Sequence, residues 1–160
     1  SGINHGANFS TNVLYSGTMS AAVEGAMENI PSIGFSLCDF SEDADFSGAQ
    51  KIVAEVTELV LKNEFPSHVC LNVNIPKLPA NEIKGIQFCK QAAAFWDDRI
   101  EERKDPFGHS YYWLMGKFQE IEVEQDTDLH FIQEGYATIV PTQFDLTAHT
   151  VINTLKNWKK

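Results

Sequence analysis

Two asparagines near the start of the chain carry side chains that could bind a cation or a phosphate. Asn4 and Asn8 lie in the segment SGINHGAN, where Gly2 and Gly6 permit backbone conformations that other residues rarely adopt. Neutral amide oxygens are hard ligands suited to Mg²⁺, Mn²⁺ or Ca²⁺, whereas amide NH₂ groups can donate to phosphate. The alternative is an ordinary Asx-rich turn without function, which composition alone favours.

A second candidate lies at the start of an expected helix, at Ser16, Gly17 and Thr18. Free backbone N–H groups and the helix dipole attract anions at such a position, and two hydroxyls add donors. The alternative is a helix cap with no further function. The segment is not a P-loop, because no lysine follows the glycine, and the GxSxG frame of a nucleophile elbow is missing. A serine hydrolase that uses Ser16 without a metal stays open as an alternative.

Asp145 and His149 are four residues apart, a spacing that places both on one face of a helix and could bind a metal. We expect Asp145 to precede the helix, so a capping role and an Asp–His hydrogen bond at the helix start are favoured. The other histidines share no spacing typical of metal ligands and are interpreted as loop or surface residues: His5, His68, His109 and His130.

The first half of the chain predicts an α/β fold with a mainly parallel sheet. A polar loop over 1–12 is followed by a helix over 16–28, a buried strand over 32–37, a helix over 46–63 and a strand over 68–75. The second helix is the clearest, because Ile52, Val56 and Val60 form an apolar stripe at helical spacing. This order of elements requires crossover helices between parallel strands.

The second half is rich in expected strands. We predict them over 83–94, 110–116, 118–123 and 136–140, with turns at 105–108 and near Asp126. The mixed charges over 97–105 are typical of a solvated loop. A short helix over 127–133 would end at Gly135, and a final helix over 148–158 has one apolar face. Such a lone terminal helix often docks on a neighbouring subunit.

Charge and composition exclude several classes of protein. The chain has 160 residues with 12 Lys and Arg against 22 Asp and Glu, giving a net charge of −10. No stretch approaches the roughly 18 consecutive apolar residues of a membrane-spanning helix. The negative charge argues against binding to a nucleic-acid duplex, which needs a basic face, and suits recruitment of divalent cations. Three widely spaced cysteines predict neither a disulfide framework nor a thiolate zinc site, and indicate a reducing cytoplasm.

Several ordered segments together resemble the SurE family of metal-dependent 5′/3′-nucleotidases. The first is SGINHGANFSTNVLYSGTMSAAVEGAMENIPSIGFSL at the start, and it is followed by LNVNIP at 71–76, IKGIQF at 83–88, DPFGHSYYW at 105–113 and EGYATIVPTQFDLTAH at 134–149. The resemblance implies a Rossmann-like domain, of which 1–104 would be the C-terminal portion. It also implies a β-rich extension and an exchanged C-terminal helix over 105–160.

The resemblance further implies hydrolysis of nucleoside monophosphates with a divalent cation, Mg²⁺ or Mn²⁺, with Ca²⁺ as a further option. Asn4 corresponds to a metal ligand, and Asn8, Ser16, Gly17 and Thr18 correspond to positions that line the phosphate site. The family's aspartate pair and ligand serine are absent from this sequence. We therefore expect a C-terminal segment of a longer polypeptide that is inactive by itself. Phe107 stands where many relatives have arginine.

The family forms dimers or tetramers by exchanging its C-terminal helix and a β-hairpin. The resemblance therefore implies a homo-oligomer that assembles through the C-terminal arm. We assign Asp145 and His149 to the hinge of that arm. The competing hypothesis is a non-catalytic segment whose function is assembly alone.

Overall fold

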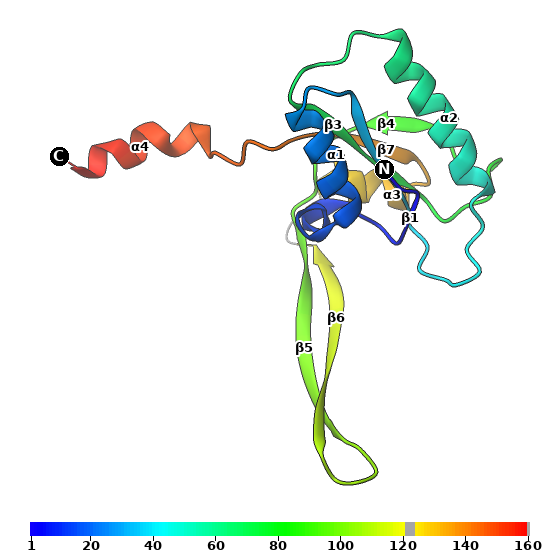
Figure 1. The fold of residues 1–160 in the computed structure, drawn as a ribbon, viewed down its shortest axis with the longest axis vertical. Coiled ribbons are helices and arrows are strands. Elements are labelled where there is room, and N and C mark those ends of the chain that lie inside the picture. Colours follow the sequence, from blue (N-terminus) through cyan, green and yellow to red (C-terminus); the bar gives the residue numbers. More distant parts are fainter. Residues whose placement is uncertain (121–123, 160) are drawn as a thin grey trace.

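A computed structural model describes residues 1–120 and 124–159 of the chain. Its centre is a five-stranded sheet in the order β1-β2-β3-β7-β4, in which only the β3–β7 pair is antiparallel (Figure 1). The α/β class with a mainly parallel sheet is thereby confirmed. The strands are β1 (Asn4–His5), β2 (Ser32–Leu37), β3 (Val69–Ile75), β4 (Ile86–Phe88), β5 (Ala94–Lys104), β6 (Ser110–Glu120) and β7 (Ala137–Gln143).

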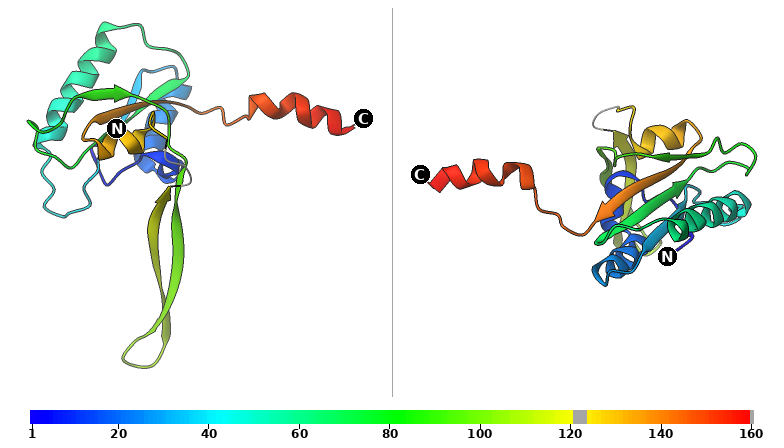
Figure 2. Two further views of the ribbon diagram at one scale, coloured as in Figure 1. Left: turned by 180° about the vertical axis from the view of Figure 1, so that it is seen from behind. Right: turned by 90° about the horizontal axis from the view of Figure 1, so that it is seen from above.

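Helices cover both faces of this sheet. Successive side chains of a strand point to opposite faces. Cys70 of β3 packs against α1 (Gly17–Met27), whereas Leu71 and Val73 pack against α2 (Ser47–Lys62) (Figures 1 and 2). α1 approaches the sheet closely at Gly34, where a Cβ atom would lie 2.4 Å from the sulfur of Met19.

The predicted elements of the first half are confirmed to within about one residue. Ser16 caps α1, as its Oγ accepts a hydrogen bond from the Met19 amide at 3.0 Å. The helix predicted over 127–133 is α3 (Asp128–Gln133), which Thr127 caps, and Gly135 follows it with φ of +88°. The strand predicted over 136–140 is the longer β7.

The polar loop predicted over 1–12 is wrong in part. β1 pairs in parallel with Ser36 and Leu37 of β2, and a 3₁₀ helix spans Ser10–Tyr15. Two residues form no detectable hydrophobic period, so sequence patterning could not identify this strand. Ser1 extends the contact with β2, because its amino group donates to the Ile33 carbonyl at 2.8 Å.

The single strand predicted over 83–94 is also wrong. Only β4 pairs there with β7, and the chain then leaves the sheet edge to bridge from Lys90 to Thr127 before β5 begins. The expected solvated loop over 97–105 is mostly strand β5. Its mixed charges stay in solvent on a strand, where Arg99 and Asp97 form an ion pair two residues apart.

β5 and β6 form a two-stranded antiparallel hairpin that projects from the body (Figure 1). The break predicted between the strands over 110–116 and 118–123 is wrong. β6 continues past Gly116 without interruption to Glu120. Residues 121–123 of that prediction lie outside the described residues. The predicted turn at 105–108 is confirmed, with Gly108 at φ of +86°. The division of the chain at residue 104 stays a prediction.

The C-terminal segment extends away from the body as an arm (Figure 2). The continuous helix predicted over 148–158 is divided: α4 (Ile152–Lys156) lies between 3₁₀ turns at His149–Val151 and Asn157–Lys159. Three apolar side chains of this segment are exposed, Val151, Leu155 and Trp158, the last at 77%. Within the described ranges 1–120 and 124–159, no helix has the length and apolar character needed to cross a membrane.

One buried carboxylate joins three separate segments. Asp128, which is fully buried, accepts hydrogen bonds from the backbone amides of Ser10 at 2.8 Å, Ala92 at 2.9 Å and Leu129 at 2.8 Å. Burial raises the pKa of the Asp128 carboxyl, and these hydrogen bonds oppose that shift. Ser10 has φ of +55° and its hydroxyl also contacts the Ala92 and Ala94 carbonyls. The N-terminal loop, the hairpin base and α3 are therefore held together.

Replacing Asp128 by asparagine should destabilise the protein. One carboxylate oxygen becomes an NH₂ group that must face a backbone N–H, so at least one buried donor loses its acceptor. We expect Asp128→Asn to lower the free energy of unfolding by ~1–3 kcal/mol in a denaturant titration of the intact protein. The exposed Asp126→Asn serves as the matched control. Equal stability of the two variants would contradict the role assigned to Asp128.

Candidate functional site

A row of four polar residues crosses the sheet near the carboxyl ends of its parallel strands. Asn4 of β1 is in register with Ser36 of β2, which is in register with Asn74 of β3. Asn74 is in turn opposite Thr138 of β7, so the four side chains share one face. We call these four residues the polar row. Ligands of open α/β sheets bind outside the carboxyl ends of the strands, where this row lies.

Three of the four residues of the polar row are buried, whereas Asn4 is half-buried. Ser36, Asn74 and Thr138 each have 0% exposure. Among the described residues, the Thr138 hydroxyl has no hydrogen-bond partner. The alternation HVCLNVNI predicted the strand correctly, but polar residues on an alternating strand usually face water. Buried polar side chains of this kind are retained where they position a backbone or a ligand.

Asn8 is fixed above the polar row by three hydrogen bonds. Its backbone amide donates to Oδ1 of Asn74 at 2.8 Å, and its Nδ2 donates to Oγ of Ser36 at 2.7 Å. Its carbonyl accepts from Nδ2 of Asn72 at 2.8 Å, and Asn72 also accepts from Asn74 at 3.0 Å. The structure thus places Asn8 at the carboxyl edge of the sheet. Sequence patterning singled out neither Asn72 nor Asn74, whose signal is an amide in a strand that is otherwise apolar.

Asn4 lies at the β1 end of the polar row. Its Nδ2 donates to the Gly6 carbonyl at 2.9 Å, which orients the side chain and leaves Oδ1 as the atom available to a cation. Asn4 and Asn8 are therefore brought together through Ser36, which pairs with one and contacts the other. Gly6 itself has φ of +86°, a conformation that favours glycine.

The start of α1 lies at the same edge of the sheet, because the helix crosses back over the sheet to reach the beginning of β2. Ser16 is buried, and its hydroxyl is used to cap the helix. Gly17 is exposed, and nothing lies within 4 Å of the position that a Cβ would occupy there. The open approach to the N–H groups of Gly17 and Thr18 leaves them as the donors that a ligand can reach.

Two titratable groups follow the end of β2, and one is a buried thiol while the other is an ion-paired carboxylate. Burial raises the pKa of the Cys38 thiol to about 12, so it stays protonated at neutral pH. The Asp39 carboxylate forms an ion pair with Lys77 at 2.8 Å. That ammonium group and the Ser41 hydroxyl lower the Asp39 pKa to about 2. Neither group is poised to act as a nucleophile or a general base.

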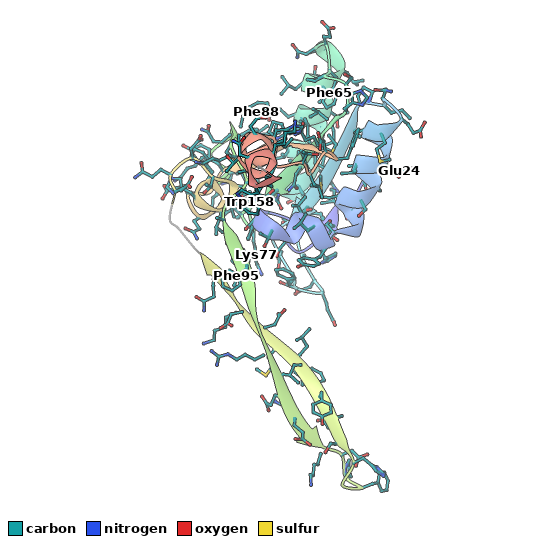
Figure 3. The ribbon with its side chains drawn as sticks, turned by 90° about the vertical axis from the view of Figure 1, so that its left-hand side faces the viewer. Glu24, Phe65, Lys77, Phe88, Phe95 and Trp158 are labelled. Carbon is teal, nitrogen blue, oxygen red and sulfur yellow. The ribbon has the colours of Figure 1, made fainter. Side chains whose placement is uncertain are left out.

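A hollow of about 400 Å³ opens beside Asn8. Its lining comes from the N-terminal loop, from Phe40 after β2 and from Phe95 at the base of the hairpin, which Figure 3 labels. Asn4 and the residues 16–18 are not among its lining residues. No sequence pattern marks Phe40 or Phe95 as functional, because isolated aromatic residues usually belong to a core.

Asp145 and His149 lie beyond the opposite end of the strands, where the parallel strands begin. β7 runs antiparallel to β3, and Gln143 pairs with Val69 at the beginning of β3. The predicted hydrogen bond is confirmed, with Nε2 of His149 at 2.8 Å from Oδ2 of Asp145. Within the described part of the chain, no cluster of three or more His, Cys, Asp or Glu residues could hold a metal ion. The pair connects β7 to the C-terminal arm.

Residues 1–98 match the model of a family described as Survival protein SurE. The chain is 55% identical over 158 residues to a protein named 5′-nucleotidase SurE from Christiangramia forsetii. It is 53% identical over 159 residues to a protein of the same name from Flavobacterium johnsoniae. Each match covers 99% of this chain and 61% of the relative, so the chain spans about three fifths of the length of these curated relatives.

A solved structure shows the same fold. The crystal structure of the Sure protein from Aquifex aeolicus matches with a TM-score of 0.81 at 34% sequence identity. The match covers 99% of this chain and 64% of that chain. The α/β fold with its mainly parallel sheet therefore has a counterpart in a solved structure.

The hydrogen bond from Asn8 to Asn74 can be tested by amide exchange. Asn74→Leu leaves the buried Asn8 N–H without an acceptor, so we expect a loss of ~1–3 kcal/mol in stability and faster exchange at Asn8. The Cys38 amide, which donates to the Ile75 carbonyl at 2.8 Å, keeps its partner and is the internal control. Equal acceleration at Asn8 and Cys38 would show a global rather than a local effect and would contradict the anchoring role.

Proposed function

The chain belongs to the SurE family, and we propose that in the intact protein it supplies part of a phosphomonoesterase site that hydrolyses nucleoside monophosphates. The observation that carries the proposal is the polar row, with Asn8 fixed above it at the carboxyl edge of the sheet. The names of the curated relatives support the same class of reaction. The proposal is also supported by the neutral character of the polar row and Asn8, which would not repel a phosphate.

A divalent cation, Mg²⁺ or Mn²⁺, fits this donor set in part. Oδ1 of Asn4 is a hard oxygen that its own Nδ2 hydrogen bond holds in place. A single neutral amide does not hold such a cation at useful affinity, since these sites need carboxylate charge. We therefore assign the carboxylate ligands to the part of the relatives' length that this chain does not span. When bound, the cation supplies positive charge that offsets the charge developing on the phosphoryl oxygens.

The chain's own residues orient and stabilise the phosphate. The N–H groups of Gly17 and Thr18 at the start of α1 donate to non-bridging oxygens, and the helix dipole favours negative charge there. Asn8 donates the second N–H of its side-chain NH₂ group, whose first N–H is bonded to Ser36. Donors fixed before the reaction stabilise the transition state without further reorganisation. The group that attacks phosphorus is assigned to residues outside this chain, because Asp39 is held by Lys77.

The competing serine hydrolase receives no support from the geometry. The Ser16 hydroxyl accepts the Met19 amide hydrogen bond, and among the described residues no imidazole is hydrogen-bonded to it. A serine nucleophile needs a base within hydrogen-bond reach. The phosphomonoesterase is therefore the proposal that we retain.

Asn4→Ala tests the proposed metal ligand. Loss of a ligand oxygen should raise the Mn²⁺ concentration for half-maximal phosphate release from AMP by at least about tenfold, since even residues that only support metal ligands commonly contribute 10–100-fold. The measurement is a Mn²⁺ titration of phosphate release by the intact protein.

The matched control for this titration is Asn63→Ala. Asn63 is exposed and follows α2, at the opposite edge of the sheet from Asn4. Its replacement should leave the Mn²⁺ dependence unchanged. If Asn4→Ala behaved in the same way as this control, the assignment of Asn4 to the metal would be wrong.

We also propose that a second copy of the chain binds the C-terminal arm, residues 145–159. The arm lies outside the body (Figure 1) and exposes Val151, Leu155 and Trp158, of which Figure 3 labels Trp158. A groove of about 760 Å³ lies between α1 and the end of β7, with Val23 and Val140 in its lining. The groove reaches the root of the arm, so two copies related by a two-fold axis could exchange arms symmetrically.

The Asp145–His149 pair is the proposed hinge of this arm. Asp145 also accepts the Thr147 amide at 2.9 Å, and hydrogen bonding from Thr147 and His149 lowers its pKa to about 2. We expect His149→Ala to change the distribution of oligomers in sedimentation velocity while Mn²⁺ affinity measured by calorimetry stays constant. His130→Ala is the control. A collapse of Mn²⁺ affinity with an intact oligomer would identify His149 as a ligand instead.

A further inference from the structure

Ser10 holds an unfavourable backbone conformation in a buried part of the N-terminal loop. Its φ of +55° lies in the left-handed region, which residues that carry a side chain seldom occupy. Such a conformation is costly and persists only where the surrounding contacts impose it. Because Ser10 is two residues from Asn8, the contacts that impose this conformation also bear on the proposed phosphate site.

Ser10 is the junction between the two groups of proposed phosphate donors. Asn8 precedes it, and the 3₁₀ helix that begins at Ser10 leads to the N–H groups of Gly17 and Thr18 at the start of α1. The φ angle of Ser10 is the rotation that relates the residues before it to this 3₁₀ helix. A return to negative φ would therefore turn Asn8 away from its present orientation relative to Gly17 and Thr18.

The Asp128 carboxylate fixes the backbone of Ser10 from α3. Its Oδ2 accepts the Ser10 amide hydrogen bond at 2.8 Å, while its Oδ1 accepts those of Ala92 and Leu129. Ser10 and Asp128 each have 0% exposure, so water cannot replace the carboxylate as acceptor unless this part of the fold opens. The carboxylate is therefore the group on which the conformation of Ser10 depends.

The residue between these two anchors has little freedom to absorb a change. Asn8 is bonded to the polar row on one side, and Ser10 is bonded to Asp128 on the other. Phe9 lies between them, and its ring packs edge-on against Phe118 of β6 with 5.4 Å between the ring centroids. A rotation at Ser10 is consequently passed on to Asn8 rather than lost in a mobile loop.

We propose that Asp128 is a positioning residue of the phosphate site: by imposing the left-handed conformation of Ser10, it sets the orientation of Asn8 relative to the N–H groups of Gly17 and Thr18. The inference rests on the proposed function. Asp128 does not contact the phosphate in this proposal, because it is buried and its two oxygens already accept three backbone amides. It acts on the reaction through Ser10.

The first test is the kcat/KM for AMP of the intact protein with Asp128→Asn. A misplacement of ~1 Å near a reacting centre can lower a rate by about 100-fold, so we expect a loss of at least about tenfold. Thr127→Ala is the matched control, since it removes the hydroxyl that caps α3 and leaves the carboxylate in place. Both variants are assayed at a temperature at which they are folded. Equal losses in the two variants would show a role in stability alone and would overturn the inference.

Ser10→Gly supplies a second readout, which a merely structural role would not move. Glycine adopts positive φ without steric cost, so the loop no longer needs the carboxylate to impose this conformation. We expect the loss of kcat/KM caused by Asp128→Asn to be at least about threefold smaller in the Ser10→Gly background than in the unmodified protein. An equal loss in both backgrounds would mean that Asp128 does not act through Ser10, and the inference would be wrong.

Amide exchange separates this inference from the proposed function. If the unmodified protein released no phosphate from AMP, the proposed function would fail, and exchange would then decide the positioning role. A larger acceleration of exchange at Asn8 than at Cys38 in Asp128→Asn, which Ser10→Gly reduces, supports it. Equal acceleration at the two amides, no acceleration at Asn8, or no reduction by Ser10→Gly overturns it.

Discussion

The structure depends on the buried Asp128 carboxylate. It gathers amide hydrogens from Ser10, Ala92 and Leu129, which belong to the N-terminal loop, the approach to the hairpin and α3. A carboxylate is removed from water at a high cost unless its oxygens are hydrogen-bonded. Three fixed donors offset that cost, and the same hydrogen bonds hold the three segments next to one another. Because Ser10 is two residues from Asn8 and Ala92 three residues from Phe95, the same interaction locates both sides of the hollow.

The polar row follows a related principle at the carboxyl edge of the sheet. Amide side chains are poor fillers of a core, since each buries donors and acceptors that must be satisfied together. Here Asn74 donates to Asn72, and each of the two also bonds to the backbone of Asn8. Their hydrogen bonds convert a glycine-containing loop into a fixed platform. A platform of neutral groups suits a chain whose net charge of −10 would otherwise repel a phosphate.

The sequence was informative where one period dominated. The apolar stripe of Ile52 and Val56 and the alternation in 68–75 predicted α2 and β3 to within about one residue. It was uninformative where pairing with a distant segment decides the structure: β1 exists because Asn4 pairs with Ser36, and charged β5 is a strand because β6 lies opposite. Motif resemblance singled out Asn4 and Asn8, and the structure brings the two together through Ser36. Phe40 and Phe95 meet at one hollow only in three dimensions, so no local pattern records their proximity.

The root of the hairpin has a mechanical consequence. Ala94 begins β5, and both its amide and its carbonyl are hydrogen-bonded to the Ser10 hydroxyl. The base of the hairpin is thus attached to the loop that carries Asn8. A shift of the hairpin base would therefore act directly on Ser10, two residues from Asn8.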